Sequence, residues 1–252
     1  MKKRYKPFLF LLLLLLIWHI VASMKLVSAY ALPSPQKVFN TFTTMLMSGV
    51  IFRDIIVSIK RVGNGFSCAF LLAFTVGMIT FLKPKLNEYY EFLIQFFRNV
   101  PPLSLTPLLI LWCGIGETTK IVIIVLASFF PMYLNIVKGF VSCESKLLEV
   151  GQMFGFSSFK QFYRIILPNA IGDILVGMRI GLGYSFRAII GAEMIAASSG
   201  LGYSILFAQQ TSRTDKVIVG IMMIGLVGYT CDKLCSLLIA IYLKGDKPNV
   251  WS

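Results

Sequence analysis

The chain has 252 residues, of which 57% are hydrophobic and 14% are charged, and its mean hydropathy is +0.79. This composition exceeds the apolar share of ordinary soluble domains, so it predicts an integral membrane protein without a second, soluble domain. The formal net charge of +13 does not indicate a nucleic-acid partner, because the basic residues are scattered at the ends of apolar runs rather than gathered on one helix face.

Six apolar segments are long enough to cross a bilayer as helices, which predicts an all-α, polytopic bundle of about six transmembrane helices. The segments cover residues 8–31, 62–82, 89–112, 121–140, 171–192 and 217–243. Lys2, Lys3, Arg4 and Lys6 precede the first segment and favour a cytoplasmic amino terminus. Six spans then return the carboxyl terminus to the cytoplasm.

The first segment has an alternative interpretation as a cleaved signal peptide, because Ala29-Tyr30-Ala31 is a small-residue cleavage pattern. Its apolar stretch is too long for such a peptide, which favours an N-terminal transmembrane helix over residues 1–31. Beyond it, a Pro-rich turn at residues 32–35 precedes apolar residues at helical spacing from Val38 to Leu46. These predict an amphipathic helix on the outer membrane surface.

The third segment contains Arg98-Asn99-Val100-Pro101-Pro102. Two consecutive prolines remove backbone donors, so the helix is expected to break or kink there. Irregular backbone inside a membrane usually lines a cavity, although neighbouring helices can also absorb a plain kink. Both interpretations stay open.

Between the fourth and fifth segments lies a loop over residues 142–168 with the pattern Glu149-Val150-Gly151, then Gly155, then Ile165, Leu167 and Pro168. Ser145 is expected to cap a first short helix, Gly155 to end it and Ser157 to cap a second. Pro168 is expected to open the next membrane span. The loop therefore predicts two short helices joined by a tight turn.

The spacing of this loop resembles the EAA loop of ABC importer permeases, although that family usually has Ala where Val150 and Gly151 stand. Further elements resemble the nitrate, sulfonate, taurine and bicarbonate branch of the binding-protein-dependent permeases. They are LPSP at residues 32–35, SIKRVGNGF at 58–66, RNVPP at 98–102, LWCGIGE at 111–117, AEMI at 192–195 and GLGY at 200–203.

The resemblance implies a permease transmembrane domain over residues 32–252, in which the loop 142–168 docks on a separate ATPase subunit in the cytoplasm. The implied coupling residues are Glu149, Gly151, Gly155, Leu167 and Pro168. It also implies a second permease copy, an extracytoplasmic solute-binding protein and a multi-pass location in the cytoplasmic (inner) membrane. The chain has no G-x-x-x-x-G-K-[ST] loop, so its energy would come from the ATPase partner.

Ionisable residues inside membrane spans normally face a cavity or a partner, because burying them in lipid is costly. The candidate path residues are Arg98, Arg179, Tyr184, Arg187 and Glu193. Arg179 and Arg187 are expected on one side of the fifth span, where their planar guanidinium groups would suit an oxyanion. In the alternative interpretation, Asp173 and Glu193 serve only to neutralise these arginines, or Arg179 anchors the coupling region.

Other function classes have weaker support. A secondary carrier would be expected to show internal repeats and acidic relays, and an intramembrane enzyme would need a catalytic constellation that the lone His19 does not supply. No metal or cofactor site is predicted, since Cys231 and Cys235 share a helix face without a further ligand nearby. The substrate stays open between a small anion such as nitrate, a sulfonate or taurine and a pyrimidine-type vitamin precursor.

Overall fold

The structure is a computed structural model that describes residues 6–24 and 27–242, and all regular secondary structure in these residues is helical. The all-α prediction is therefore confirmed. The elements are α1 (Lys6–Ser23), α2 (Pro35–Met47), α3 (Val50–Leu82), α4 (Pro84–Arg98), η1 (Pro102–Leu105), α5 (Thr106–Cys113), α6 (Glu117–Val141), α7 (Ser145–Met153), α8 (Ser158–Gln161), η2 (Phe162–Ile166), α9 (Leu167–Ala196), α10 (Leu201–Gln210) and α11 (Thr214–Tyr242).

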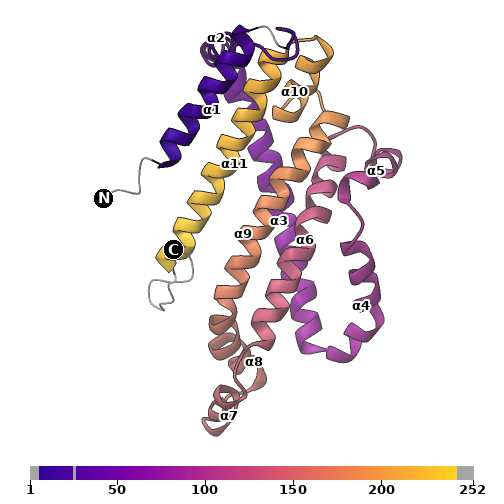
Figure 1. Cartoon of the computed structure of the whole chain (residues 1–252). Coiled ribbons are helices and arrows are strands. Elements are labelled where there is room, and N and C mark those ends of the chain that lie inside the picture. Colours follow the sequence, from indigo (N-terminus) through magenta and orange to yellow (C-terminus); the bar gives the residue numbers. More distant parts are fainter. Residues whose placement is uncertain (1–5, 25–26, 243–252) are drawn as a thin grey trace.

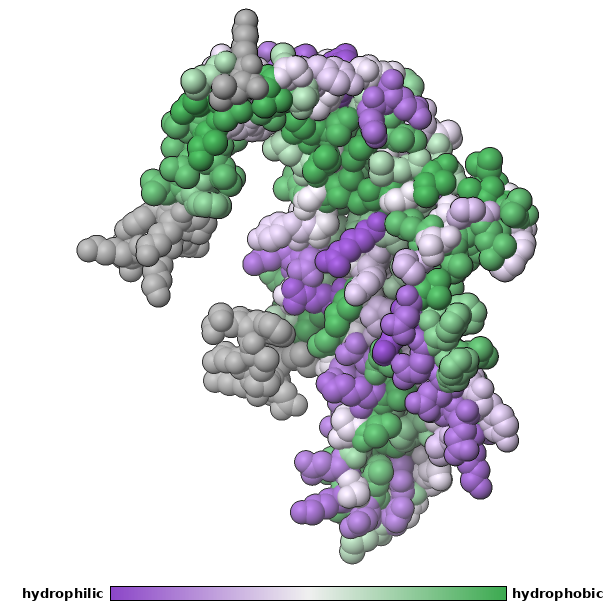
Figure 2. All heavy atoms as spheres, turned by 45° about the vertical axis from the view of Figure 1, so that its right-hand side comes forward, coloured by the Kyte–Doolittle hydropathy of each residue, from purple (hydrophilic) through white to green (hydrophobic). Residues whose placement is uncertain are grey.

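The molecule is elongated, with α7 and α8 at one end and α2 and α10 at the other (Figure 1). We call these the α7 end and the α2 end. The long helices run between them, and the hydrophobic side chains of the face in Figure 2 gather toward the α2 end while hydrophilic ones gather toward the α7 end. Hydrophilic side chains also edge the tip of the α2 end in this view.

The predicted spans correspond in order to α1, α3, α4 with α5, α6, α9 and α11. Among the described residues, α3, α6, the continuous helix Ser158–Ala196 and α11 are long and apolar enough to cross a membrane. The first span is shorter than predicted, because α1 ends at Ser23. The basic residues 2–4 and Leu243 at the end of the sixth prediction lie outside the described residues.

The third predicted span is not one continuous helix. α4 ends at Arg98, the chain is non-helical through Pro101, and η1 and α5 complete the pass. Pro101 and Pro102 carry no backbone N–H, so neither can continue the helical hydrogen-bond ladder. The predicted break is confirmed.

The predicted start of the second span is wrong, since α3 begins at Val50 rather than at residue 62. Asp54, Ser58 and Arg61 lie in the added turns and are buried. Contacts with other helices satisfy them, as the site shows below.

The core lies where α6 packs between α3 and α9. Met132, Ile136 and Phe140 of α6 are fully or almost fully buried there. A Cβ added at Gly177 would lie 2.7 Å from Asn135 Cβ, and one added at Gly181 would lie 2.7 Å from Met132 Cγ. These glycines let α9 approach α6 closely, as small residues do between packed membrane helices.

The predicted amphipathic helix is α2. Its N-terminus is capped by Ser34, whose Oγ accepts a hydrogen bond from the Lys37 N–H at 3.3 Å, and Pro35 occupies the first helical position. The indole N–H of Trp18 donates to the Pro33 carbonyl at 3.1 Å and so ties α1 to the turn before α2. Val38 is the buried residue of α2 and packs beside Ile51 and Val219.

Candidate functional site

The sequence-predicted site residues fall into two regions. Glu149, Gly151, Gly155, Leu167 and Pro168 lie at the α7 end, between α7 and the start of α9. The path candidates lie further along the bundle, with Arg98 at the end of α4 and Arg179, Tyr184, Arg187 and Glu193 on α9.

A tight turn at Gly155 joins α7 to α8. Gly155 has φ +68°, its N–H donates to the Gln152 carbonyl at 2.8 Å, and the Phe156 N–H donates to the Gly151 carbonyl at 3.0 Å. These two bonds form a Schellman motif, in which a residue with positive φ ends a helix, as Gly does most easily. The predicted helix break at Gly155 is confirmed.

The two short helices begin in different ways. The Ser157 side chain accepts a hydrogen bond from the Lys160 N–H at 3.4 Å, which confirms the predicted cap of the second helix. The first helix is capped by Glu144 without a side-chain bond, so the expected Ser145 cap is wrong and Ser145 is already helical.

Pro168 does not open a new helix. Residues Ser158 to Ala196 form one continuous helix, and Pro168 lies within it. Because Pro168 lacks an N–H, the α-helical ladder cannot run through it unchanged, and the preceding residues adopt a π-turn in which the Leu167 N–H donates to the Phe162 carbonyl. The second short helix is therefore rigidly continuous with the membrane span.

The predicted coupling residues divide into exposed and buried positions. Glu149 is exposed, and its side chain makes no hydrogen bond or ion pair with another described residue. Gly151 is buried, and a Cβ there would lie 2.7 Å from Ile165 Cδ1, while Leu167 packs against the core. The close approach at Gly151 thus brings α7 against the long helix.

Large apolar side chains are exposed on the two short helices and in the turn between them. Met153, Phe154 and Phe159 are each more than 70% exposed. Such a surface at the tip of a helical protein indicates a protein contact. Glu149 adds an acidic group on the same α7 helix.

Glu193 does not face a path. Its side chain is completely buried, and Arg61 Nη1 of α3 donates to Glu193 Oε1 at 2.8 Å. The Ser58 hydroxyl and the Gly202 N–H also donate to this carboxylate, at 2.8 Å and 2.9 Å. The expectation of a path role for Glu193 is corrected: its two oxygens are already occupied by partners of the same chain.

Arg61 extends this pair into a network that joins α3, α6 and α9. Arg61 Nε and Nη2 donate to Glu117 Oε2 and Oε1 at 2.7 Å each, and Arg61 Nη1 also donates to the Ser199 carbonyl. Lys120 Nζ donates to Glu117 Oε1 at 2.7 Å. We refer to Ser58, Arg61, Glu117, Lys120 and Glu193 as the buried network.

Sequence reasoning missed this network. Arg61 lay just outside the predicted second span and was taken as part of a family element rather than as a buried partner. The sequence did contain a signal for it. Asp54, Ser58 and Arg61 are spaced at helical intervals, so one helix face carries all three polar groups.

Arg179 is also paired within the chain. Its Nε and Nη2 donate to Asp232 Oδ1 and Oδ2 of α11 at 2.7 Å and 2.8 Å, a bidentate geometry. Asp173, expected to neutralise an arginine, instead accepts from Lys138 Nζ at 2.8 Å. Arg179 therefore ties α9 to α11, and Asp173 ties α9 to α6.

Arg187 and Tyr184 remain exposed on α9. The Arg187 guanidinium lies 5.7 Å from the centre of the Tyr184 ring, in cation–π range. No described carboxylate is within ion-pair distance of Arg187. Arg187 lies about 14 Å along α9 from the helix end at Ala196, at 1.5 Å per residue.

The broken third pass lies next to this part of α9. A Cβ at Gly191 would be 2.5 Å from Leu103 Cδ1 of η1, and Gly191 is one helical turn from Arg187. Arg98 is exposed at the end of α4, just before the break. The structure thus places an unpaired arginine, a tyrosine and irregular backbone on neighbouring segments.

Curated proteins similar to this chain are membrane permeases. A Bacillus subtilis protein named as an aliphatic sulfonates transport permease is 36% identical over 96% of this chain and 89% of its own length. The taurine transport system permease protein of Escherichia coli is 34% identical over 87% of this chain and 82% of its own length. The nitrate import permease protein of a Synechocystis strain is 24% identical over 97% of this chain and 91% of its own length.

Solved structures support the fold. A chain of an amino acid ABC transporter superposes with a TM-score of 0.60 at 16% identity, covering 82% of this chain and 96% of that one. A chain of the MetNI methionine ABC transporter superposes with a TM-score of 0.55 at 14% identity, covering 77% of this chain and 97% of that one. Residues 66–239 match the protein family described as the binding-protein-dependent transport system inner membrane component, and the chain belongs to this family of transport permeases.

Proposed function

We propose that this permease passes a small oxyanion of the sulfonate type through the membrane, in a complex with ATPase subunits, a solute-binding protein and a second copy of itself. Arg187 is the observation that supports this substrate class. It is an exposed cation in the interior of a membrane-length helix, and it has no carboxylate partner among the described residues. An arginine at such depth faces a partner or water, because contact with lipid is costly.

The chemistry of Arg187 fits an anion with several oxygens. The guanidinium is permanently charged and donates two parallel hydrogen bonds to a planar or tetrahedral oxyanion. The relatives named for sulfonates, taurine and nitrate transport act on substrates with such oxygens. A neutral pyrimidine-type precursor would gain much less from this arginine.

The exposure of Tyr184 and Arg187 also supports a complex that contains a second copy of the permease. In a single chain, Tyr184 and Arg187 would face lipid, since Tyr184 is 47% exposed and Arg187 is also classed as exposed. A second copy facing this part of α9 would enclose a hydrated space between the two arginines. The path would then run between the copies.

The coupling mechanism follows from the continuity of α8 with α9. A movement of α8 reaches Arg187 through one helix, over about 44 Å at 1.5 Å per residue. An ATPase that pulls or tilts α7 and α8 would therefore reorient the path residues directly. On this proposal the α7 end is cytoplasmic and the α2 end faces the binding protein.

The direct test is uptake by the reconstituted complex. The permease, its ATPase and its binding protein are placed in proteoliposomes containing ATP, and accumulation of taurine, an alkanesulfonate, nitrate and a neutral pyrimidine precursor is compared. We expect accumulation of at least one of the anions and none of the neutral compound. Accumulation of the pyrimidine alone would overturn the proposed substrate class while leaving the family assignment intact.

Docking of the ATPase is expected to depend on Glu149. Glu149→Lys reverses a charge on the exposed coupling surface, so we expect the yield of co-purified ATPase to fall about tenfold, in line with the loss of one or two charge-assisted contacts. Pull-down from detergent-solubilised membranes measures this yield at matched permease levels.

Glu88→Lys is the matched control, because Glu88 is an exposed acid on α4 outside the coupling surface. It is expected to retain the wild-type yield. Equal ATPase yield from Glu149→Lys and Glu88→Lys would mean that docking uses another surface, and would also remove the argument for a cytoplasmic α7 end.

A further inference from the structure

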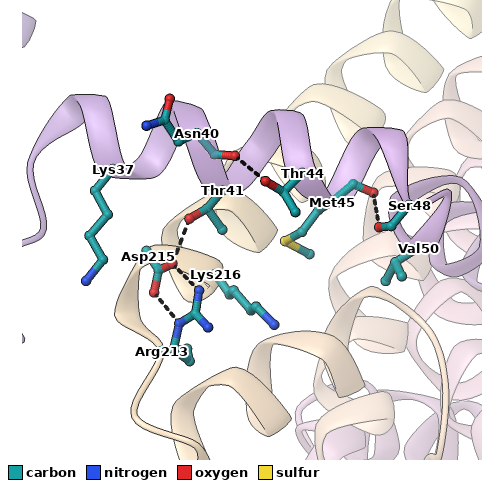
Figure 3. Close-up of a pocket in the computed structure, with 10 residues that line it drawn as sticks. All are labelled: Lys37, Asn40, Thr41, Thr44, Met45, Ser48, Val50, Arg213, Asp215 and Lys216. Atoms are coloured by element: carbon teal, nitrogen blue, oxygen red, sulfur yellow. Dashed lines mark hydrogen bonds and ion pairs between the residues drawn. The ribbon is translucent and has the colours of Figure 1, made fainter.

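A polar hollow of about 480 Å³ lies at the α2 end, between α2 and the beginning of α11. Figure 3 shows side chains from α2 on one side and from the α10–α11 connection on the other. Its walls are formed by Lys37, Asn40, Thr41, Thr44, Met45, Ser48, Val50, Arg213, Asp215 and Lys216. None of the roles described above uses this hollow.

The only acidic group in its wall is already neutralised. Arg213 Nε and Nη2 donate to Asp215 Oδ1 and Oδ2 at 3.0 Å and 2.8 Å, and the Thr41 hydroxyl donates to Asp215 Oδ2 at 2.7 Å. The carboxylate of Asp215 raises the pKa of Arg213 above its ordinary value, so this guanidinium stays charged. The Arg213–Asp215 pair therefore contributes little net charge.

Two lysines lie on either side of this pair (Figure 3), Lys37 on α2 and Lys216 in the first turn of α11. Within residues 6–24 and 27–242, neither has a carboxylate in ion-pair range. Asn40 and Thr44 add polar groups to the same wall. The hollow thus carries two uncompensated positive charges beside hydrogen-bonding side chains.

Exposed apolar side chains also occur on α11, the membrane-length helix whose first turn forms part of the hollow. Met45 and Val50 line the hollow itself, and further along α11 Ile221, Met222 and Leu226 are each more than half exposed. A ligand with an anionic head and long apolar chains could place its head between the lysines and its chains along α11. A free anion would use only the head portion.

We propose that this hollow binds the phosphate headgroup of an anionic phospholipid at the membrane surface. Lys37 and Lys216 attract the phosphate, and the Thr44 hydroxyl oxygen accepts a hydrogen bond from a hydroxylated headgroup such as glycerol. Basic side chains at a membrane interface attract anionic lipids, and the amphipathic α2 would be held at that interface by the bound headgroup.

The test measures lipid binding to the full-length permease purified with its ATPase partner. Delipidated complex is titrated with phosphatidylglycerol or phosphatidylcholine of the same chain length, and bound lipid is counted by native mass spectrometry. We expect a clear preference for phosphatidylglycerol. The double variant Lys37→Gln/Lys216→Gln is expected to lose about tenfold to thirtyfold of that affinity.

The control variant is Arg53→Gln, which removes an exposed cation at the same end of the molecule, outside the hollow. It is expected to bind phosphatidylglycerol like the wild type. Equal affinity of the double variant and the wild type would overturn the proposal. Displacement of the lipid by millimolar glycerol 3-phosphate would show a site for free phosphate instead, and displacement by the solute-binding protein would show a protein docking surface.

Discussion

Replacing Glu193 by alanine is expected to destabilise the folded permease by about 3 kcal/mol or more, because it leaves a buried arginine short of a partner. Arg61 would keep Glu117, whose side chain is 58% exposed, so we place the cost at the lower end of the range for a broken buried pair. Loss of the acceptor for the Ser58 hydroxyl and the Gly202 N–H adds to the cost. Thermal unfolding of the purified protein in lipid nanodiscs measures the effect.

Asp173→Ala is the matched control for Glu193→Ala. It breaks the Lys138–Asp173 pair, whose side chains are 69% and 23% exposed, and such exposed pairs contribute about 0–1 kcal/mol. Glu193→Gln should fall between the two, since it keeps the shape and one acceptor oxygen of the side chain but loses the charge and the second acceptor. If Glu193→Ala and Asp173→Ala unfolded at the same temperature, the buried network would not stabilise the fold.

Apolar length was sufficient to predict most of the passes from the sequence. α6 and α9 contain the segments that hydropathy indicated, and α11 covers the described part of the sixth segment, because long apolar runs in a chain of this composition have few alternatives to a membrane helix. The two prolines at residues 101 and 102 also predicted the break correctly, since their effect on the helical ladder is local. Local chemistry was therefore reliable where no distant partner was needed.

The first turns of α3 could not be predicted in this way. Asp54 receives hydrogen bonds from the Ser204 hydroxyl and the Gly200 N–H, and Arg61 bonds to Glu117 and Glu193. These partners are more than fifty residues away in sequence. A hydropathy window therefore counts the polar groups but not the distant hydrogen-bond partners that allow them to be buried. Burial of paired polar groups is a tertiary property.

The same reason explains the mixed outcome for the site. The pattern around Gly155 predicted the turn between α7 and α8, because positive φ is a property of one residue and its neighbours. Arg179 and Arg187 were equivalent in the sequence, and only the position of Asp232 on α11 distinguishes the paired arginine from the unpaired one. Spacing on one helix cannot reveal a partner on another.

Arg187→Gln is expected to lower anion uptake about tenfold to a hundredfold at matched levels of assembled complex. A hydrogen bond to a charged group contributes about 1.5–3 kcal/mol, and each 1.4 kcal/mol changes binding or rate about tenfold. Because Arg187 is exposed and makes no ion pair within the described residues, its removal leaves no buried charge unpaired. Assembly with the ATPase and basal ATP hydrolysis should therefore stay near wild-type values.

Two further variants separate charge from geometry. Arg187→Lys keeps the positive charge but not the planar fork, so we expect part of the uptake to remain. Arg53→Gln removes an exposed cation near the start of α3, well away from Arg187 on α9, and should leave uptake unchanged.

Uptake is measured in proteoliposomes with saturating binding protein. Equal uptake by the wild type and Arg187→Gln would exclude Arg187 from the path. A loss of assembly in Arg187→Gln would instead assign it to the contact between the two copies, since Arg187 makes no ion pair within the described residues of one chain.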